Sequence, residues 1–196
     1  MNIKELPLFP LKLILLPLEK LPLHIFEPRY KKMIYNAISN NKPFGIVWKN
    51  SDNIYNIGCQ AKVSKVINEY PNGEYDIVVQ GTNRFEIDNT LIDNKTVIGK
   101  INYISEDKEC SNSLIKEIRE NYLKILISLG EVSNLNNDLE KNFSYEFIQN
   151  MLLPIDIKKQ LISTNVEEER VKIINKLFIK ILSSPLDQAN QNIAKA

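Results

Sequence analysis

The sequence has few of the residues on which recognisable catalytic motifs depend. Its 196 residues include six glycines, two cysteines and one histidine. It contains no Gly-x4-Gly-Lys-Ser/Thr phosphate-binding loop, because Gly99-Lys100 is followed by Ile101. The single histidine, His24, excludes any mechanism or metal site that needs two, and neither a Cys-x2-Cys pair nor a Gly-x-Ser-x-Gly elbow occurs. We therefore expect a protein that is not an enzyme, with no catalytic residues, no metal ligands and no cofactor.

The remaining candidates for chemistry also have simple structural interpretations. Two Ser-x-x-Lys matches, which begin at Ser39 and Ser113, lie at expected helix boundaries, where serine is a favoured cap and lysine an ordinary surface residue. A hydrolase hypothesis requires a pocket that gathers His24, Cys59 or paired carboxylates. Glu167–Glu169 could bind a cation, but three glutamates also suit the solvated first turn of a helix.

Neither sign of charge dominates, since 25 Lys and Arg residues are matched by 24 Asp and Glu residues. Binding to a phosphate backbone needs clustered positive charge, and arginine reads phosphates and guanines better than lysine does. The chain has only four arginines: Arg29, Arg84, Arg119 and Arg170. Binding to a nucleic acid is therefore disfavoured, and an RNA-binding module is retained as the alternative function, one that needs a basic patch hidden by the total charge.

The sequence also lacks a long uninterrupted apolar run. Four prolines, at positions 7, 10, 17 and 22, divide the apolar N-terminal region together with charged residues, so this region predicts neither a membrane span nor a secretory signal. Two cysteines do not make a disulfide framework, and we interpret Cys59 and Cys110 as reduced thiols. A cytoplasmic protein with no membrane partner is expected.

The first half of the chain has the pattern of β-structure around one helix. Proline-punctuated apolar segments predict edge strands or strand ends, and Pro28 suits the first position of a helix that ends near Asn40. Asn72-Gly73 predicts a type I′ turn between two β-branched arms. The expected strands cover residues 3–9, 11–18, 21–26, 44–48, 61–70, 74–80, 84–91 and 96–104, the last two joined through Asp93-Asn94. Together they predict a curled antiparallel sheet or a partly open barrel.

The second half predicts helices. Ser113 is the expected cap of a helix over 114–129, and Asn165 with Glu168 resembles a capping box that opens a helix over 166–182. A loop is expected over 131–142 and short helices over 145–152 and 155–162. The predicted organisation is a β-rich subdomain over 1–108, an α-helical subdomain over 109–183 and a disordered tail over 184–196.

One set of collinear motifs is specific. It consists of the segments Leu6–Leu11, Leu21–Tyr30, Phe44–Val47, Asp76–Gly81 and Arg84-Phe85. Their order resembles the LON substrate-binding domain family, which includes the N-terminal domain of ATP-dependent Lon proteases and shorter proteins made of that domain alone. The resemblance implies an α+β fold, in which an N-terminal antiparallel β pseudobarrel of PUA-like type, with one helix, precedes a C-terminal α-helical subdomain.

The resemblance also implies a function. In Lon proteases this region is thought to recognise unfolded or tagged proteins. Because this sequence ends before any ATPase or peptidase module, unfolding and cleavage are not carried over, and a non-catalytic protein- or peptide-binding module is expected. The expected partners are unfolded or tagged polypeptides, with a protease or chaperone as a further partner in an adaptor or chaperone-like role.

Three residues within the family motifs are candidates for a peptide-binding surface at the mouth of the sheet: Arg29, Tyr30 and Arg84. The same residues have a structural interpretation. Glu27, Arg29 and Arg84 could form a charge-assisted network that fixes the helix on the sheet.

Overall fold

The computed structural model describes residues 4–51, 53–93, 95–131 and 135–183, which form two compact units. The first, called the β-rich unit, contains residues 4–105 together with Gln149–Ser163. The second, called the helical unit, contains Glu106–Ile148 together with residues 164–183. From the sequence, one boundary between the two subdomains was expected, after residue 108. In the structure, Gln149–Ser163 returns to the β-rich unit. The tail predicted over 184–196 lies outside the described residues, as does Asn94.

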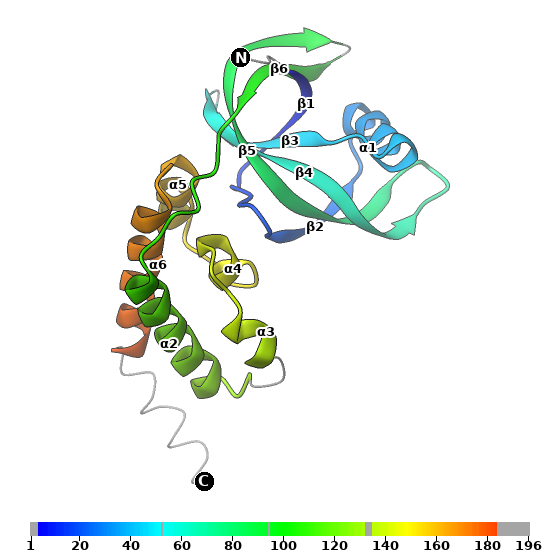
Figure 1. The fold of residues 1–196 in the computed structure, drawn as a ribbon. Coiled ribbons are helices and arrows are strands. Elements are labelled where there is room, and N and C mark those ends of the chain that lie inside the picture. The colour runs from blue at the N-terminus through cyan, green and yellow to red at the C-terminus, as the bar shows by residue number, and fades with distance from the viewer. Residues whose placement is uncertain (1–3, 52, 94, 132–134, 184–196) are drawn as a thin grey trace. The chain divides into compact units, whose positions relative to one another are not determined.

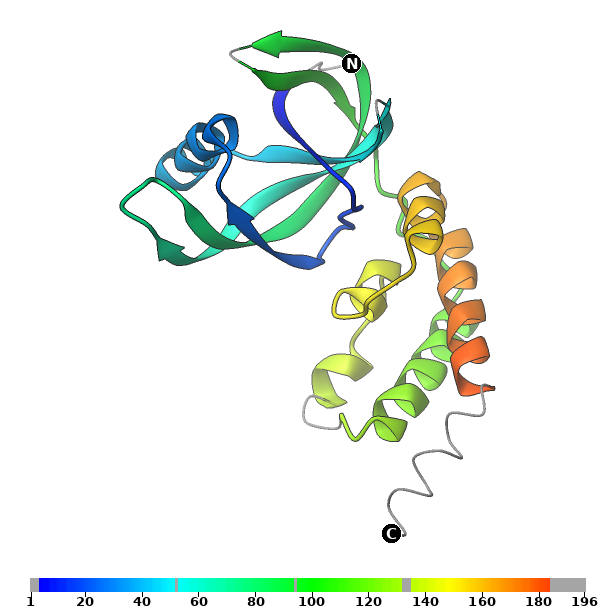
Figure 2. The ribbon, with the colours of Figure 1, turned by 180° about the vertical axis from the view of Figure 1, so that it is seen from behind.

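The β-rich unit is a sheet that closes on itself (Figures 1 and 2). Its strands are β1 (Lys4–Leu11), β2 (Lys20–Ile25), β3 (Phe44–Asn50), β4 (Asn53–Glu69), β5 (Tyr75–Asp93) and β6 (Thr96–Tyr103). The strand order is β2-β5-β4-β3-β1-β6, and β5 also pairs with β6, so five strands form a ring and β2 is added to the outside of β5. The mixed α+β class predicted from the sequence is confirmed. One pair, β1 with β3, is parallel rather than antiparallel, because a long connection through β2 and a helix separates these strands.

Strand β5 holds the sheet together because it is long enough to pair with three strands. Its first residues pair with both β2 and β4, and its last residues pair with β6. Both β4 and β5 are longer than predicted. Register shifts at Cys59/Ala61, Val63/Lys65 and Val66/Asn68 let these strands bend continuously, so that segments predicted as separate strands form one.

The strand predicted over 11–18 is wrong beyond Leu11. Residues 12–19 form an irregular segment whose apolar side chains, such as Leu15 and Leu16, are buried against the sheet. Its end is fixed by two backbone hydrogen bonds, in which Leu18 N–H donates to the carbonyl of Gly81 (2.9 Å) and Gly81 N–H donates to the carbonyl of Glu19 (3.0 Å). An apolar run interrupted by proline can therefore be buried without joining a ladder.

The turn between β4 and β5 also differs from the prediction. Gly73 has φ of +76°, and its N–H donates to the carbonyl of Tyr70 at 2.8 Å, which places Pro71 and Asn72 at the centre of the turn. In a type I′ turn around Asn72-Gly73, Pro71 would have to donate a ladder hydrogen bond, and proline has no N–H. Pro71 instead suits the second position of a type I turn, and glycine then supplies the left-handed residue that follows.

Helix α1 (Pro28–Asn40) begins at Pro28 as predicted and covers part of the sheet. Tyr30, Met33, Ile34 and Ala37 recur at spacings of three and four and are all buried. The ring of Tyr30 lies 4.1 Å from that of Phe9 on β1, centroid to centroid. This face therefore anchors α1 and leaves its flanking side chains exposed.

Helix α5 (Ile155–Ser163) belongs to the β-rich unit although it is distant in sequence. Lys158 Nζ donates to the carbonyl of Ile14 at 3.1 Å and forms an ion pair with Glu19. The guanidinium of Arg84 donates through Nη1 to the carbonyl of Ile162 at 2.7 Å. These contacts attach α5 both to the irregular segment 12–19 and to β5.

The helical unit contains α2 (Asn112–Ser128), α3 (Leu135–Leu139), α4 (Ser144–Ile148) and α6 (Glu167–Leu182). Helices α2 and α6 lie side by side (Figures 1 and 2). The Tyr122 ring lies 5.6 Å from that of Phe147 and 5.9 Å from that of Phe178, so its ring joins three helices. The long helices were predicted, whereas α3 lies inside the predicted loop.

The predicted caps of the long helices are wrong. Ser111, rather than Ser113, precedes α2, and Val166 precedes α6, with no side-chain capping bond at either position. Glu167 instead serves a buried network. Ser144 Oγ donates to Glu167 Oε2 at 2.7 Å, and Arg170 donates to the same oxygen through Nη2 at 2.8 Å. Tertiary partners therefore replace local capping at the start of α6.

The first prediction concerns Gly81. A Cβ at this position would lie 2.1 Å from the carbonyl oxygen of Leu16. The substitution Gly81→Ala therefore requires the backbone of β5 to move away from the backbone at Leu16. We expect the free energy of unfolding to fall by at least about 3 kcal/mol, as for severe overpacking. Denaturant titration by circular dichroism would measure it. Gly130→Ala is the control, because nothing lies within 4 Å of a Cβ there and only its φ of +74° is strained. Equal losses for the two variants would contradict the expectation.

The second prediction concerns Arg170, which is fully buried with Glu167. Desolvation raises the pKa of Glu167, and hydrogen bonds from Ser144 and the charge of Arg170 oppose that rise. Arg170→Met leaves a buried carboxyl without its cation, and we expect a loss of about 3–5 kcal/mol in unfolding free energy. Arg170→Met combined with Glu167→Gln should recover part of that loss. A double variant no more stable than the single one would refute this account.

Candidate functional site

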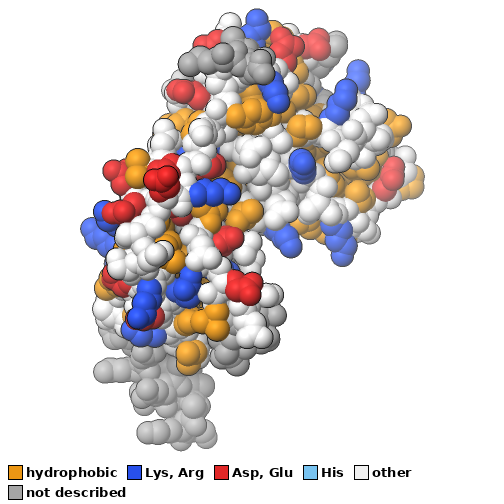
Figure 3. Space-filling view, in the orientation of Figure 1, with side chains coloured by type: hydrophobic (Ala, Val, Ile, Leu, Met, Phe, Trp, Pro, Cys, Tyr) orange, Lys and Arg blue, Asp and Glu red, His pale blue; other side chains and the backbone are white. Residues whose placement is uncertain are grey.

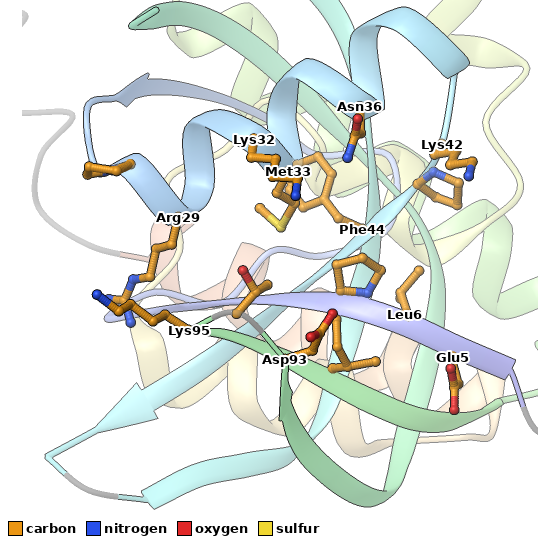
Figure 4. A pocket seen from close by; sticks show the side chains of 15 residues that line it. Glu5, Leu6, Arg29, Lys32, Met33, Asn36, Lys42, Phe44, Asp93 and Lys95 are labelled. Atoms are coloured by element: carbon orange, nitrogen blue, oxygen red, sulfur yellow. The ribbon is translucent and has the colours of Figure 1, made fainter.

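The β-rich unit contains a pocket of about 740 Å³ beside α1, called here the α1 pocket. Its walls come from α1, the first half of β1, the start of β3 and the hairpin that joins β5 to β6 (Figure 4). These elements are distant in sequence and meet because β1 pairs with both β3 and β6. Closure of the sheet therefore creates the pocket.

Apolar side chains form the inner surface of the α1 pocket. Leu6 from β1, Met33 from α1 and Phe44 from β3 are buried residues that line it, and Ile98 from β6 is half-buried. Figure 4 shows Met33 extending from the helix toward Phe44. Such a surface gains free energy when an apolar group displaces water from it.

Charged side chains from the same elements surround this apolar surface. Four are cationic, namely Arg29, Lys32, Lys42 and Lys95, and two are acidic, namely Glu5 and Asp93. In the view of Figure 4, Arg29 and Lys95 lie at one end of the pocket and Lys42 lies at the other. The pocket therefore combines an apolar interior with a predominantly cationic border.

The three residues singled out in the sequence lie in different environments. Arg29 is 43% exposed and lines the pocket, with its Nη2 donating to Glu27 Oε2 at 2.8 Å and its guanidinium over the Tyr30 ring at 4.5 Å. Tyr30 is buried against Phe9, and burial raises the pKa of its hydroxyl. Arg84 is fully buried. Of the predicted surface at the mouth of the sheet, only Arg29 lies at the pocket.

Four residues that line the pocket were not predicted as site residues from the sequence: Lys32, Met33, Lys42 and Lys95. The helical period of α1 places Lys32 next to the buried face, so the position of Lys32 beside the sheet could have been predicted from the sequence. Lys95 follows the β5 strand by two positions, and nothing local indicates that the hairpin reaches α1. That proximity follows from the pairing of β6 with β1.

Neither His24 nor Cys59, the side chains named in the hydrolase hypothesis, lines the α1 pocket. Cys59 is buried on β4, with its Sγ 3.1 Å from the position of a Cβ on Gly81, whereas His24 is exposed on β2 and contacts Asp76. Both Cys59 and Cys110 are free thiols. Within the ranges the structure describes, no group of three or more His, Cys, Asp or Glu side chains could hold a metal ion.

Asp76 is the centre of an exposed polar cluster at the start of β5. Its carboxylate accepts hydrogen bonds from Tyr70 Oη at 2.6 Å and from Asn68 Nδ2 at 3.1 Å, and His24 Nδ1 lies 2.7 Å from its other oxygen. These hydrogen bonds, that from Tyr70 above all, lower the pKa of Asp76 from 3.8 to about 2. The cluster links β2, β4 and β5 where the sheet's outer strand ends.

The third prediction follows from this pKa. Because the carboxyl has a lower pKa when folded, its contribution to stability is present above its ordinary pKa of 3.8 and is lost as the pH falls toward about 2. We expect Asp76→Asn to lower the melting temperature at pH 7 and the two melting curves to converge between pH 4 and pH 2. Thermal unfolding across this range would measure it, and a constant difference between the two proteins would count against the assignment.

Among the helices that the structure describes, none has both the length and the apolar composition needed to cross a membrane.

Three features together define a domain of the Lon N-terminal class. They are the closed sheet whose first strand is rich in proline, the helix that begins at Pro28, and the separate helical unit. The chain belongs to the ATP-dependent protease La (LON) substrate-binding domain family, whose sequence model matches residues 5–180. The resemblance seen in the sequence motifs is therefore confirmed.

Curated relatives include the Lon proteases of Flavobacterium johnsoniae and Parabacteroides distasonis, each 25% identical over 186 and 187 residues respectively. The matches cover 85% and 88% of this chain but only 23% and 22% of those proteins. The chain thus spans less than a quarter of the length of these relatives.

Two solved structures have the same fold. The N-terminal domain of Mycobacterium avium complex Lon protease matches with a TM-score of 0.71 and 17% identity, covering 89% of this chain and 98% of that one. The Lon N-terminal domain protein from Xanthomonas campestris matches with a TM-score of 0.66 and 18% identity, covering 88% and 97%. At these identities the likeness establishes the fold.

Proposed function

We propose that this protein is a substrate-recognition module, which binds polypeptide segments that lack folded structure and holds them without making or breaking covalent bonds. Membership in a family of substrate-binding domains supports the first part. The second part is supported by the nature of the matched region, which is a substrate-binding domain over residues 5–180. The role would be that of an adaptor or chaperone-like factor, acting with a protease or chaperone in the cytoplasm, where thiols such as Cys110 stay reduced.

The α1 pocket is the single observation that carries the proposal. Its volume of about 740 Å³ falls within the range of roughly 300–1,000 Å³ that is typical of ligand pockets. A pocket of this size accepts a few side chains of an extended segment and is too small for a folded domain. Above the buried Leu6, Met33 and Phe44, the partly exposed Pro7 and Ile98 offer apolar surface of the kind that unfolded chains expose and folded proteins bury.

The alternative of an RNA-binding module has less support. A phosphate backbone requires a basic stripe, and on the face drawn in Figure 3 acidic and basic side chains are interspersed. The four cations of the pocket surround an apolar surface and are accompanied by Glu5 and Asp93. Aliphatic side chains such as Leu6 and Met33 add nothing to the binding of phosphates, whereas they suit a polypeptide.

The fourth prediction tests the pocket with an apolar substitution on β6. Ile98→Thr keeps the β-branched shape but removes apolar surface from the lining. We expect the affinity for a reduced, carbamidomethylated model protein to fall about tenfold, which corresponds to the loss of roughly 1.5 kcal/mol of apolar burial. Fluorescence anisotropy with the labelled unfolded protein would measure it, with thermal melts confirming that the variant is folded.

Ile92→Thr on β5 is the matched control. Ile92 is 78% exposed, lies on the same hairpin and does not line the pocket. Its substitution should leave the affinity unchanged. Failure of the unsubstituted protein to bind the unfolded protein at micromolar concentration would overturn the proposed function, and equal effects of the two substitutions would remove the pocket from it.

A further inference from the structure

We propose that the α1 pocket selects segments in which apolar side chains are flanked on both sides by carboxylates. The inference rests on the proposed function and names the substrate class that the pocket takes. An acidic segment interrupted by apolar residues would place those residues on the partly exposed apolar lining, which includes Pro7 and Ile98, while its carboxylates meet the cations at the border.

The lysines of the pocket are available to such a partner. Lys32, Lys42 and Lys95 are exposed, and within the described part of the chain their side chains form neither hydrogen bonds nor ion pairs. Arg29 differs, because Glu27 holds its guanidinium at 2.8 Å. The three lysines come from separate elements, namely α1, the connection to β3 and the β5–β6 hairpin. Closure of the sheet thus assembles three unpaired cations around one apolar surface.

The two acidic residues of the lining do not cancel these cations. Asp93 has an interaction partner within the chain, and the lining carries four cations against two carboxylates. Glu5 lies on β1, across the pocket from α1 and its Lys32 (Figure 4). The lining therefore keeps an excess of positive charge, which attracts carboxylates and repels basic segments.

The spacing of the cations favours an internal segment over a chain end. Arg29 and Lys95 lie at one end of the pocket in Figure 4, and Lys42 lies at the other. A single terminal carboxylate would engage only one end. A segment with carboxylates before and after its apolar residues engages both ends and is held in one register across the apolar surface.

The fifth prediction is tested with the full chain and three labelled peptides, all acetylated and amidated. Each has the same central leucine and phenylalanine residues, flanked on both sides by glutamates, by glutamines or by lysines. We expect the glutamate peptide to bind about tenfold more tightly than the glutamine peptide, because several exposed charge pairs act together, and the lysine peptide to bind least. The advantage of the glutamate peptide should shrink as salt is raised.

A triple variant locates the effect. Lys32→Gln with Lys42→Gln and Lys95→Gln should bring the glutamate peptide to the affinity of the glutamine peptide while leaving the latter unchanged. The matched control is Lys20→Gln with Lys62→Gln and Lys65→Gln, which removes three exposed lysines of the same unit that do not line the pocket. This control should retain the preference, and loss of the preference in both triple variants would overturn the inference.

Two further arms separate the outcomes. A reduced, carbamidomethylated model protein tests general binding of unfolded polypeptide. If it binds but glutamate and glutamine peptides do not differ, the inference fails and the proposed function stands; if neither it nor any peptide binds, both fail. Tighter binding of a glutamine peptide with a free terminal carboxylate, or of single-stranded RNA, than of the glutamate peptide would also overturn the inference.

Discussion

The β-rich unit depends on the hydrogen bonding of one strand, β5, which pairs with β2, β4 and β6 along its 19 residues. A strand that reaches three partners has to bend, and the register shifts in the β4–β5 ladder permit this. At its middle, the backbone of Gly81 is in direct hydrogen-bonding contact with the segment that ends at Glu19. Because β5 also carries the hairpin that lines the α1 pocket, the shape of the binding surface and the stability of the fold depend on the same strand.

Buried polar groups in both units stabilise connections that the apolar core alone would not define. Arg84 is fully buried and donates to the backbone of α5, and Arg170 is fully buried with Glu167 and Ser144. Each guanidinium supplies several directed donors, so it specifies which backbone segments meet. Two of the four arginines in the sequence, Arg84 and Arg170, therefore have structural roles.

Local patterns predicted the elements, and the assembly of the pocket required the fold. The apolar spacing from Tyr30 to Ala37 and the proline at position 28 were enough to predict α1. The prediction of a type I′ turn was wrong because the absence of an N–H on Pro71 outweighed the preference of Asn72-Gly73 for that turn type. Of the three residues proposed for the site, only Arg29 lines the pocket. Lys95 and Lys42 are brought near α1 by the pairing of β1 with β3 and β6. Such long-range pairing cannot be predicted from the residues next to them in the sequence.

The return of α5 to the β-rich unit has a consequence for biosynthesis. A growing chain emerges from its N-terminus, and domains generally fold as they become available. All six strands have been synthesised by Tyr103, yet Lys158 and Ile162, the partners of Glu19 and Arg84, lie more than 50 residues further on. A nascent β-rich unit therefore lacks the partners of Arg84 and of segment 12–19 until α5 has been translated. Translation rate across α2 to α4 thus sets how long that immature intermediate persists.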